Sequence, residues 1–278
     1  MKIKLNNKIC YVVIYLVLFI GLLINIPSKT AYDGVADFDW WSNDIMISDM
    51  MYSENFDLGG YFLNAVSPGD IAPDNALEAE GVQPEMFKKG QYFEKGMYKQ
   101  YTSNIVIQRF VYRLLDKLFI NNHAFLLKFL YCINCALAAL AMLGIFYWIS
   151  DFASAYEMII CSIILVAACP YFTMYGKNLY WCLYSLLLPT AAMAVVIKKG
   201  ELFIASVKKQ RLVLFFTAYI ACSLKMLFCF EFVTSVMIGM TIPIFYYCFI
   251  NRYRLIQIVK MIFWPFIGAM LAFVTVFG

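Results

Sequence analysis

Charged residues are scarce in this sequence: they make up 14% of its 278 residues, against about 25% in typical soluble domains. The chain also lacks a Walker loop and the motifs G-x-S-x-G, H-E-x-x-H and paired C-x-x-C. ATP-driven transport and zinc-protease chemistry therefore have no support. No internal repeat is visible, which weakens an interpretation as a secondary transporter. With 63% hydrophobic residues, the composition excludes a soluble globular domain.

Cysteine and histidine offer little chemistry. None of the nine cysteines lies in residues 28–103, so that segment has no disulfide. All nine lie in or beside apolar runs, the Cys132-x-x-Cys135 pair included, where cysteine packs as a small apolar side chain. The sole histidine, His123, follows two asparagines at a predicted helix start, and we do not expect a lone metal ligand there.

Long apolar runs, in contrast, are frequent. A helix that crosses a bilayer needs roughly 20 apolar residues. The runs predict an all-α polytopic membrane protein with 6–7 transmembrane helices. The candidate spans are Ile9–Ile26, Phe125–Ser150, Met158–Met174, Leu179–Ile197, Leu212–Phe228, Phe232–Ile250 and Met261 to the end.

The two ends of the chain need separate interpretation. The first run follows Lys2, Lys4 and Lys8 but is longer than the apolar region of a signal peptide, so we interpret it as an uncleaved anchor. The last run stops at Gly278 without a polar tail. We expect a fragment of a longer protein, the alternative being an unusually short last helix.

Basic residues set the predicted orientation, because lysine and arginine favour cytoplasmic loops. A multi-pass protein of the cell membrane with a cytoplasmic N-terminus places two basic clusters inside, at residues 198–211 and 252–260. Residues 28–123 are then extracytoplasmic. One loop disagrees, since Asp151–Glu157 has no basic residue and should be cytoplasmic.

Charge is distributed unevenly between the predicted parts. Residues 28–103 hold 13 of the 18 carboxylates and five lysines, a net charge of −8, and the rest of the chain carries +12. We therefore divide the chain into an N-terminal anchor (1–27), an acidic extracytoplasmic loop (28–123) and a helix bundle (124–278). Within the loop, Pro68–Pro84 is rich in proline, glycine and acids, which is typical of a mobile connection.

An amphipathic helix is predicted at the end of the loop, from Asn104 to Ile120. Apolar residues recur there at helical spacing and charged residues gather on the opposite face. The segment is too charged to cross a membrane and suits a helix lying in the interface.

The carboxylates nearest the first span are the main candidates for chemistry: Asp37, Asp39 and Asp44, beside Trp40 and Trp41. At the membrane surface a carboxylate can take a proton from an acceptor hydroxyl or hold a divalent cation. The tryptophans also fit a simple aromatic belt. The later acids Asp49, Glu54 and Asp57 are expected to be mostly solvated.

Cationic groups at headgroup depth could bind a lipid-linked phosphate. Arg109 lies on the predicted interfacial helix, Lys177 in an outward turn, and Lys225 with Glu231 at the outer end of a span. Charges at the edge of apolar spans are functional candidates by default. The alternatives are that Lys225 extends to the interface, that Glu231 merely ends a helix, and that the cations meet ordinary anionic lipids.

The arrangement of one span, a long acidic loop, an interfacial helix and many further spans resembles the GT-C class of membrane glycosyltransferases. Several strings look like stretches in bacterial membrane proteins associated with surface polysaccharides. They are DMMYSENFDLGGYFL (49–63), YTSNIVIQ (101–108), NLYW (178–181) and CFEFVTS (229–235). The class places a catalytic Asp or Glu in the first outer loop, which corresponds here to Asp37–Asp44. It has more spans than this chain.

The resemblance implies an enzyme that transfers a sugar from a polyprenyl-phosphate-linked donor at the outer membrane face during surface polysaccharide synthesis. Asp39, with Asp37 or Asp44, would be the base or metal ligand, and Arg109, Lys177 and Lys225 would hold the phosphate. The expected partners are the lipid-linked donor and membrane lipids, and no nucleic acid. The alternative is a non-catalytic protein that exports, flips or scaffolds lipid-linked glycans. No cofactor is identified, although a divalent cation fits the carboxylates.

Overall fold

The computed structural model describes residues 7–25, 33–56, 62–102, 106–119, 122–199, 206–229 and 231–277. Most of these residues are helical, in agreement with the predicted class. Contacts divide the chain into two compact units. Unit 1 comprises Met1–Ile20, Leu137–Leu165 and Tyr184–Gly278, and unit 2 comprises Gly21–Ala136 and Val166–Leu183.

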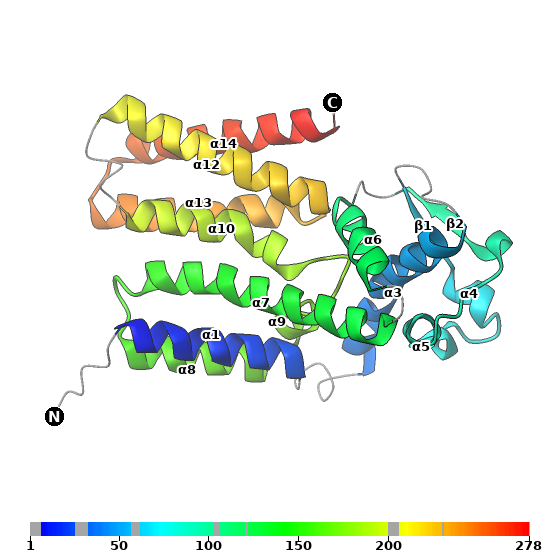
Figure 1. Cartoon of the computed structure of the whole chain (residues 1–278). Coiled ribbons are helices and arrows are strands. Elements are labelled where there is room, and N and C mark those ends of the chain that lie inside the picture. Colours follow the sequence, from blue (N-terminus) through cyan, green and yellow to red (C-terminus); the bar gives the residue numbers. More distant parts are fainter. Residues whose placement is uncertain are drawn as a thin grey trace. The chain divides into compact units, whose positions relative to one another are not determined.

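Helices dominate both units (Figure 1). The longer ones are α1 (Asn7–Ile24), α3 (Asp33–Asn55), α6 (Gln108–Leu118), α7 (His123–Ile149), α8 (Ala155–Ala168), α10 (Leu183–Lys198), α12 (Val207–Phe228), α13 (Val233–Ile250) and α14 (Leu255–Phe277). The short elements are β1 (Leu63–Ala65), α4 (Pro68–Ile71), η1 (Ala76–Ala79), α5 (Val82–Lys88), η2 (Lys95–Met97), β2 (Lys99–Tyr101) and α9 (Pro170–Met174).

Four helices among the described residues are long and apolar enough to cross a membrane: α7, α12, α13 and α14. Three shorter apolar helices, α1, α8 and α10, coincide with other predicted spans. The structure thus supports a helical membrane protein at the level of helix length and composition.

One predicted span is wrong in its extent. The run Met158–Met174 is not continuous, because α8 ends at Ala168 and Pro170 opens the separate helix α9. Proline lacks a backbone N–H and clashes with the preceding turn, so it favours a helix start over a helix interior. The last span also differs, since α14 begins at Leu255, six residues before the predicted start at Met261.

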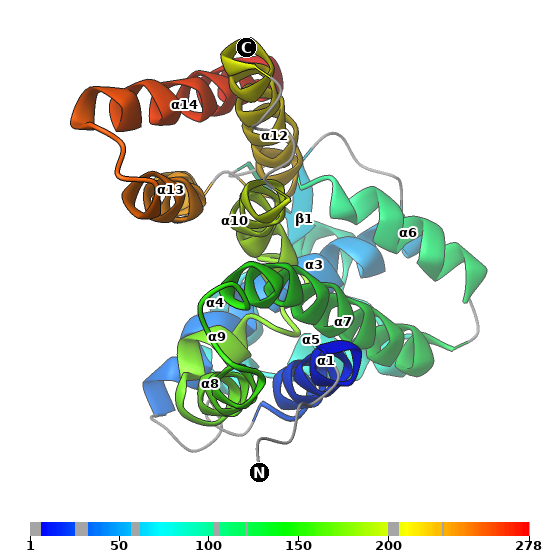
Figure 2. The ribbon, with the colours of Figure 1, turned by 90° about the vertical axis from the view of Figure 1, so that its left-hand side faces the viewer.

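Small residues bring helices of unit 1 close together. α14 packs against α12 and also contacts α13 (Figure 2). A Cβ added at Gly268 of α14 would lie 2.4 Å from the carbonyl oxygen of Phe215 in α12, so only glycine fits this contact. Ala218 of α12 and Ala272 of α14 are fully buried in the same core. Close approach through small residues is typical of helix packing in membranes.

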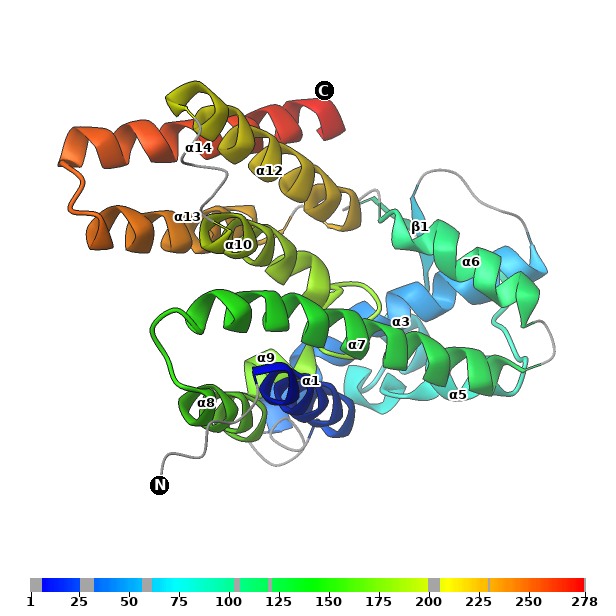
Figure 3. The same cartoon turned by 60° about the vertical axis from the view of Figure 1, so that its left-hand side comes forward.

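Unit 2 is built around α3, which contacts α5, α6 and β1 (Figure 3). The α3 residues Ile45, Met46, Ile47, Met50 and Met51 are all buried in one core with side chains of α6 and α7. The strands β1 and β2 pair antiparallel, with Leu63 opposite Tyr101. This small sheet is an addition to the predicted all-α fold.

The predicted mobile connection Pro68–Pro84 is also corrected. It contains α4, η1 and the start of α5. Gln83 is completely buried, accepts a hydrogen bond from Ser48 of α3 and donates one to the carbonyl oxygen of Val66 at 3.3 Å. These bonds to the core order a segment whose composition alone indicated mobility.

Candidate functional site

Helix α3 directs its acidic residues into different surroundings. Asp44, Asp49 and Glu54 are spaced by five residues, which is about 500° of helix rotation, or 140° net. Each therefore points away from the next one. The structure brings each to a separate set of partners within unit 2, and these partners decide what each carboxylate can do.

Asp44 is the buried member of the predicted catalytic cluster. Its side chain is 2% exposed, and Oδ2 has no hydrogen-bond partner among the described residues. Burial raises the pKa of Asp44 to about 8, a hydrogen bond from Asn43 acts in the opposite direction, and repulsion from Glu80 adds to the rise. At neutral pH this carboxyl is therefore mostly protonated, and its role as a base or metal ligand stays a prediction from the sequence.

Asp37 and Asp39, the other predicted catalytic residues, lie in the first turns of α3. Their side chains lie outside the described residues, so their roles stay predictions from the sequence.

Asp49 forms a buried charge cluster with two arginines of α6. Arg113 donates from Nε and Nη2 to the two carboxylate oxygens at 3.1 and 2.8 Å, and Arg109 donates from the same atoms at 3.3 and 3.1 Å. The backbone N–H of Asn64 donates to Asp49 at 2.9 Å. All three charged side chains are at most 5% exposed. Burial lowers the pKa of Arg109, while the Asp49 carboxylate counteracts this effect.

This cluster changes the roles expected of its members. Asp49 was predicted to be solvated, and Arg109 to meet a lipid phosphate at headgroup depth. The i, i+4 spacing of Arg109 and Arg113 places them on one face of α6, and that face is turned into the protein. The arginines face inward because they pair with the Asp49 carboxylate. Asp49 lies 60 residues before Arg109 in the chain, so the local sequence of α6 does not reveal this partner.

The apolar face of α6 is turned outward instead. Phe110 and Val111 are about half exposed, and Leu114 and Leu118 are 60% and 70% exposed. An exposed apolar stripe with a buried charged face suits a helix that rests on a membrane. The amphipathic helix is therefore present as predicted, between Gln108 and Leu118.

A photo-crosslinking test can establish what covers this stripe. A benzophenone amino acid at Leu118 is expected to label lipid in native membranes, because the side chain is exposed and belongs to the apolar stripe of α6. The same amino acid at Asp74, an exposed position in the polar part of unit 2, is the control. Mass spectrometry of the labelled peptides provides the measurement. Equal lipid labelling at both positions would contradict a membrane-facing role for this stripe.

A third group joins Glu54 of α3, Asp116 of α6 and His123 at the start of α7. Glu54 Oε1 lies 3.4 Å from His123 Nε2, and Asp116 Oδ1 lies 3.3 Å from His123 Nδ1. The His123 ring packs against Phe87, with centroids 4.9 Å apart. Burial and then repulsion from Glu54 raise the pKa of Asp116 to about 6, and His123 opposes the rise. No pattern in the sequence connects these three residues.

The turn that contains Lys177 is part of the interior of unit 2. Asn178 donates to Ser42 Oγ at 3.0 Å and accepts from the backbone N–H groups of Tyr180 and Trp181. Asn134 of α7 donates to its carbonyl oxygen at 3.1 Å. Lys177 itself is half-buried. The turn was predicted to face outward, and its Asn178 side chain connects α3 with Tyr180 and Trp181, which precede α10.

Lys225 and Glu231 lie in unit 1, at the end of α12. Lys225 is 1% exposed and donates to the carbonyl oxygens of Cys229 and Glu231, at 2.5 and 2.6 Å, with Cys229 Sγ at 3.1 Å. The chain turns after Phe228, as an approach of the two residues requires, but the bond is to the backbone of Glu231. Lys225 thus satisfies backbone carbonyls at a helix end.

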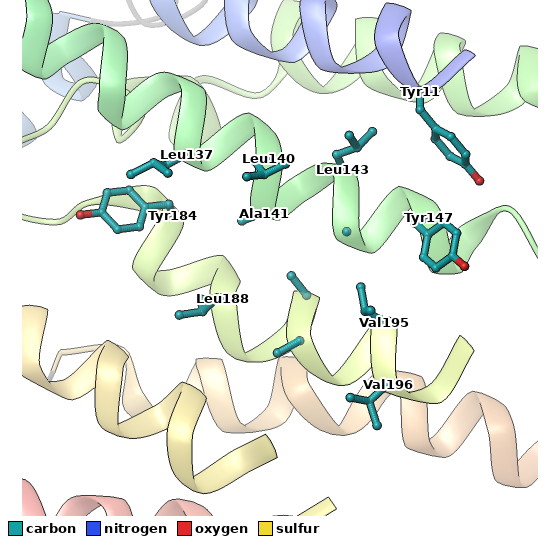
Figure 4. A pocket seen from close by; sticks show the side chains of 13 residues that line it. Tyr11, Leu137, Leu140, Ala141, Leu143, Tyr147, Tyr184, Leu188, Val195 and Val196 are labelled. Atoms are coloured by element: carbon teal, nitrogen blue, oxygen red, sulfur yellow. The ribbon is translucent and has the colours of Figure 1, made fainter. Parts of the chain in front are cut away.

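An apolar pocket of about 750 Å³ lies in unit 1 between α1, α7 and α10 (Figure 4). Aliphatic side chains such as Leu140 and Leu188 line it, with Tyr11 and Tyr147 toward one end and Tyr184 toward the other. None of its lining residues is charged. A hydrocarbon chain fits this surface, whereas a sugar does not.

Comparisons of the chain with protein-family models, curated proteins and solved structures find no match. The functional interpretation therefore depends on the geometry and chemistry of the residues described above.

Proposed function

We propose that this protein is a membrane glycosyltransferase of the GT-C type, which transfers a sugar from a polyprenyl-phosphate-linked donor at the outer membrane face during surface polysaccharide synthesis. The observation that carries the proposal is the orientation of α6. Its exposed Leu114 and Leu118 suit contact with lipid, and two arginines on its opposite face contact the Asp49 carboxylate of α3. A substrate with its tail in the bilayer would present its head group at this level.

The apolar pocket of unit 1 supports a lipid-linked substrate. Its volume of about 750 Å³ and uncharged lining suit part of a polyprenyl chain. The same lining gives no support to the alternative, in which a polar glycan crosses the bilayer, because a polar pathway requires charged or hydrogen-bonding groups along it.

In the proposed reaction, an Asp carboxylate takes the proton from the acceptor hydroxyl. The acceptor oxygen then forms a bond to the anomeric carbon, while the bond from that carbon to the phosphate oxygen breaks and polyprenyl phosphate leaves. The base has to be ionised at neutral pH, which favours Asp37 or Asp39 over the largely protonated Asp44. Lys177 is the proposed phosphate partner because its side chain is only half-buried, whereas those of Arg109 and Lys225 are almost completely buried.

The proposed topology has 6–7 spans, a cytoplasmic N-terminus and an extracytoplasmic loop at 28–123. A contact in unit 1 supports it: Lys198 at the end of α10 lies 2.7 Å from Asp151, which follows α7. The turn Asp151–Glu157, which has no basic residue although it is predicted to be cytoplasmic, thus lies beside the basic end of α10. Both are predicted to be on the cytoplasmic side. This ion pair offers a physical reason why a predicted cytoplasmic turn can lack basic residues of its own.

Single substitutions to asparagine test the proposed function. In cells that lack the gene, complementation with Asp37→Asn or Asp39→Asn is expected to lower surface polysaccharide synthesis by about 100-fold or more for the residue that is the base. The measurement is the sugar composition of the purified cell-surface glycan. Asp74→Asn, at an exposed position, is the matched control. Wild-type glycan from both variants would overturn the proposal.

A further inference from the structure

We propose that Glu54, Asp116 and His123 form a binding site for one divalent transition-metal ion. One side-chain atom from each residue can act as a ligand, and these three atoms lie within 4.8 Å of one another. The residues come from the end of α3, the last turns of α6 and the first residue of α7. The site thus joins three helices of unit 2 that the sequence separates by up to 69 positions.

Unsatisfied buried atoms point to a ligand at this place. Asp116 and His123 are 4% and 9% exposed, yet Asp116 Oδ1 and His123 Nδ1 have no hydrogen-bond partner in the described part of the chain. They face each other at 3.3 Å. Buried polar atoms without partners are rare in folded proteins, and an ion that both atoms can ligate is one of the accepted explanations.

The donor atoms indicate the kind of ion. Imidazole nitrogen suits zinc, iron, copper and nickel, whereas carboxylate oxygen suits manganese, magnesium and calcium. One nitrogen with two carboxylates fits ions that accept both types, such as Mn²⁺, Fe²⁺ and Zn²⁺. Two carboxylates also neutralise the charge of a divalent ion in a buried place.

A metal-free arrangement explains the geometry less well. A protonated His123 could bridge Glu54 and Asp116, at nitrogen–oxygen separations of 3.4 and 3.3 Å, but Asp116 Oδ1 and His123 Nδ1 have no hydrogen-bond partner in the described part of the chain. An ion bound at His123 Nδ1 and Asp116 Oδ1 would give both of these buried atoms a partner. Three protein ligands also leave coordination positions open for water or a substrate oxygen.

Mn²⁺ is the appropriate probe, because the nine cysteines would compete for Zn²⁺ but bind Mn²⁺ weakly. The full-length protein in lipid nanodiscs is treated with EDTA, dialysed and titrated with Mn²⁺. Free Mn²⁺ is followed by electron paramagnetic resonance and the apparent melting temperature is recorded. We expect one ion per chain and a rise in the melting temperature with Mn²⁺, since an ion that binds only the folded state stabilises it.

Conservative variants locate the site. Glu54→Gln, Asp116→Asn and His123→Gln are each expected to weaken Mn²⁺ binding at least about tenfold. Glu94→Gln and Asp74→Asn, both at exposed positions of unit 2, should bind Mn²⁺ as the wild type does. Glu54 is the most exposed of the three ligands, at 29% of its side chain, so its variant is the one whose folding is least affected.

Two results would overturn the proposal. One is a wild-type protein that binds no Mn²⁺ or gains no thermal stability from it. The other is a Glu54→Gln variant that folds and binds Mn²⁺ as tightly as Glu94→Gln. Both measurements are independent of sugar transfer, so a failed metal site leaves the proposed function untouched, and a failed activity test leaves the metal site untouched.

Discussion

Replacing Asp49 with asparagine is expected to destabilise the protein by about 3–5 kcal/mol, because it removes the carboxylate that two buried guanidinium groups contact. Arg109 and Arg113 each make two hydrogen bonds to this one carboxylate, and neither has access to water as a substitute. Asparagine keeps the size of the side chain but not the charge. The measurement is the loss of folded protein with increasing denaturant, in the same detergent as the wild type.

Asp70→Asn is the matched control for this experiment. Asp70 pairs with Lys99 at 2.7 Å, but the side chains are 33% and 66% exposed, so water screens the pair. Its loss is expected to cost about 0–1 kcal/mol. Adding Arg113→Gln to Asp49→Asn should restore part of the stability, since it removes one of the two buried positive charges that Asp49 contacts. A loss for Asp49→Asn as small as that for Asp70→Asn would contradict the buried cluster.

Because of Asp44, the free energy of unfolding is expected to fall as the pH rises from about 4 to about 8. The unfolded chain releases this proton near the ordinary pKa of 3.8, whereas burial holds the folded-state pKa at about 8. Below pH 4 both states are protonated and the group has no effect on stability. Between the two values the folded state keeps a proton that the unfolded state releases, so unfolding becomes easier as pH rises. The full loss is on the order of 5 kcal/mol.

Asp44→Asn removes the ionisable group and should flatten this pH dependence. Relative to the wild type, the variant is expected to melt at a higher temperature at pH 8, and at the same or a lower temperature at pH 4. The amide needs a hydrogen-bond partner of its own. The variant therefore gains less stability at pH 8 than the wild type loses between pH 4 and pH 8. Melting temperatures at half-unit pH steps provide the measurement. Asp74→Asn is the control, and equal pH slopes in the two variants would disprove a buried, protonated Asp44.

The sequence was sufficient for the features that depend on local pattern. Apolar runs of about 20 residues predicted the long helices α7, α12, α13 and α14, because length and hydrophobicity are properties of a continuous segment. The 3.6-residue period likewise predicted the amphipathic helix α6. The boundaries were less accurate where a single residue decides them, as Pro170 does between α8 and α9.

The sequence was insufficient for deciding which side of α6 is buried. In an interfacial helix the charged face was expected to point toward water and phosphate, and so Arg109 was a phosphate-binding candidate. Asp49, predicted to be solvated, provides the interaction that reverses this choice. Its 60-residue separation from Arg109 leaves no periodic signal that would connect them.

The composition of this chain by itself determined a helical protein suited to a membrane, with a separate acidic segment after its first apolar helix. Only the tertiary structure decided the surroundings of three of its carboxylates, Asp44, Asp49 and Glu54. Asp44 is protonated by burial, Asp49 is neutralised by two arginines, and Glu54 lies beside His123. The physical reason is that a carboxyl group responds to charges and solvent within a few ångströms. Folding brings those neighbours from distant segments.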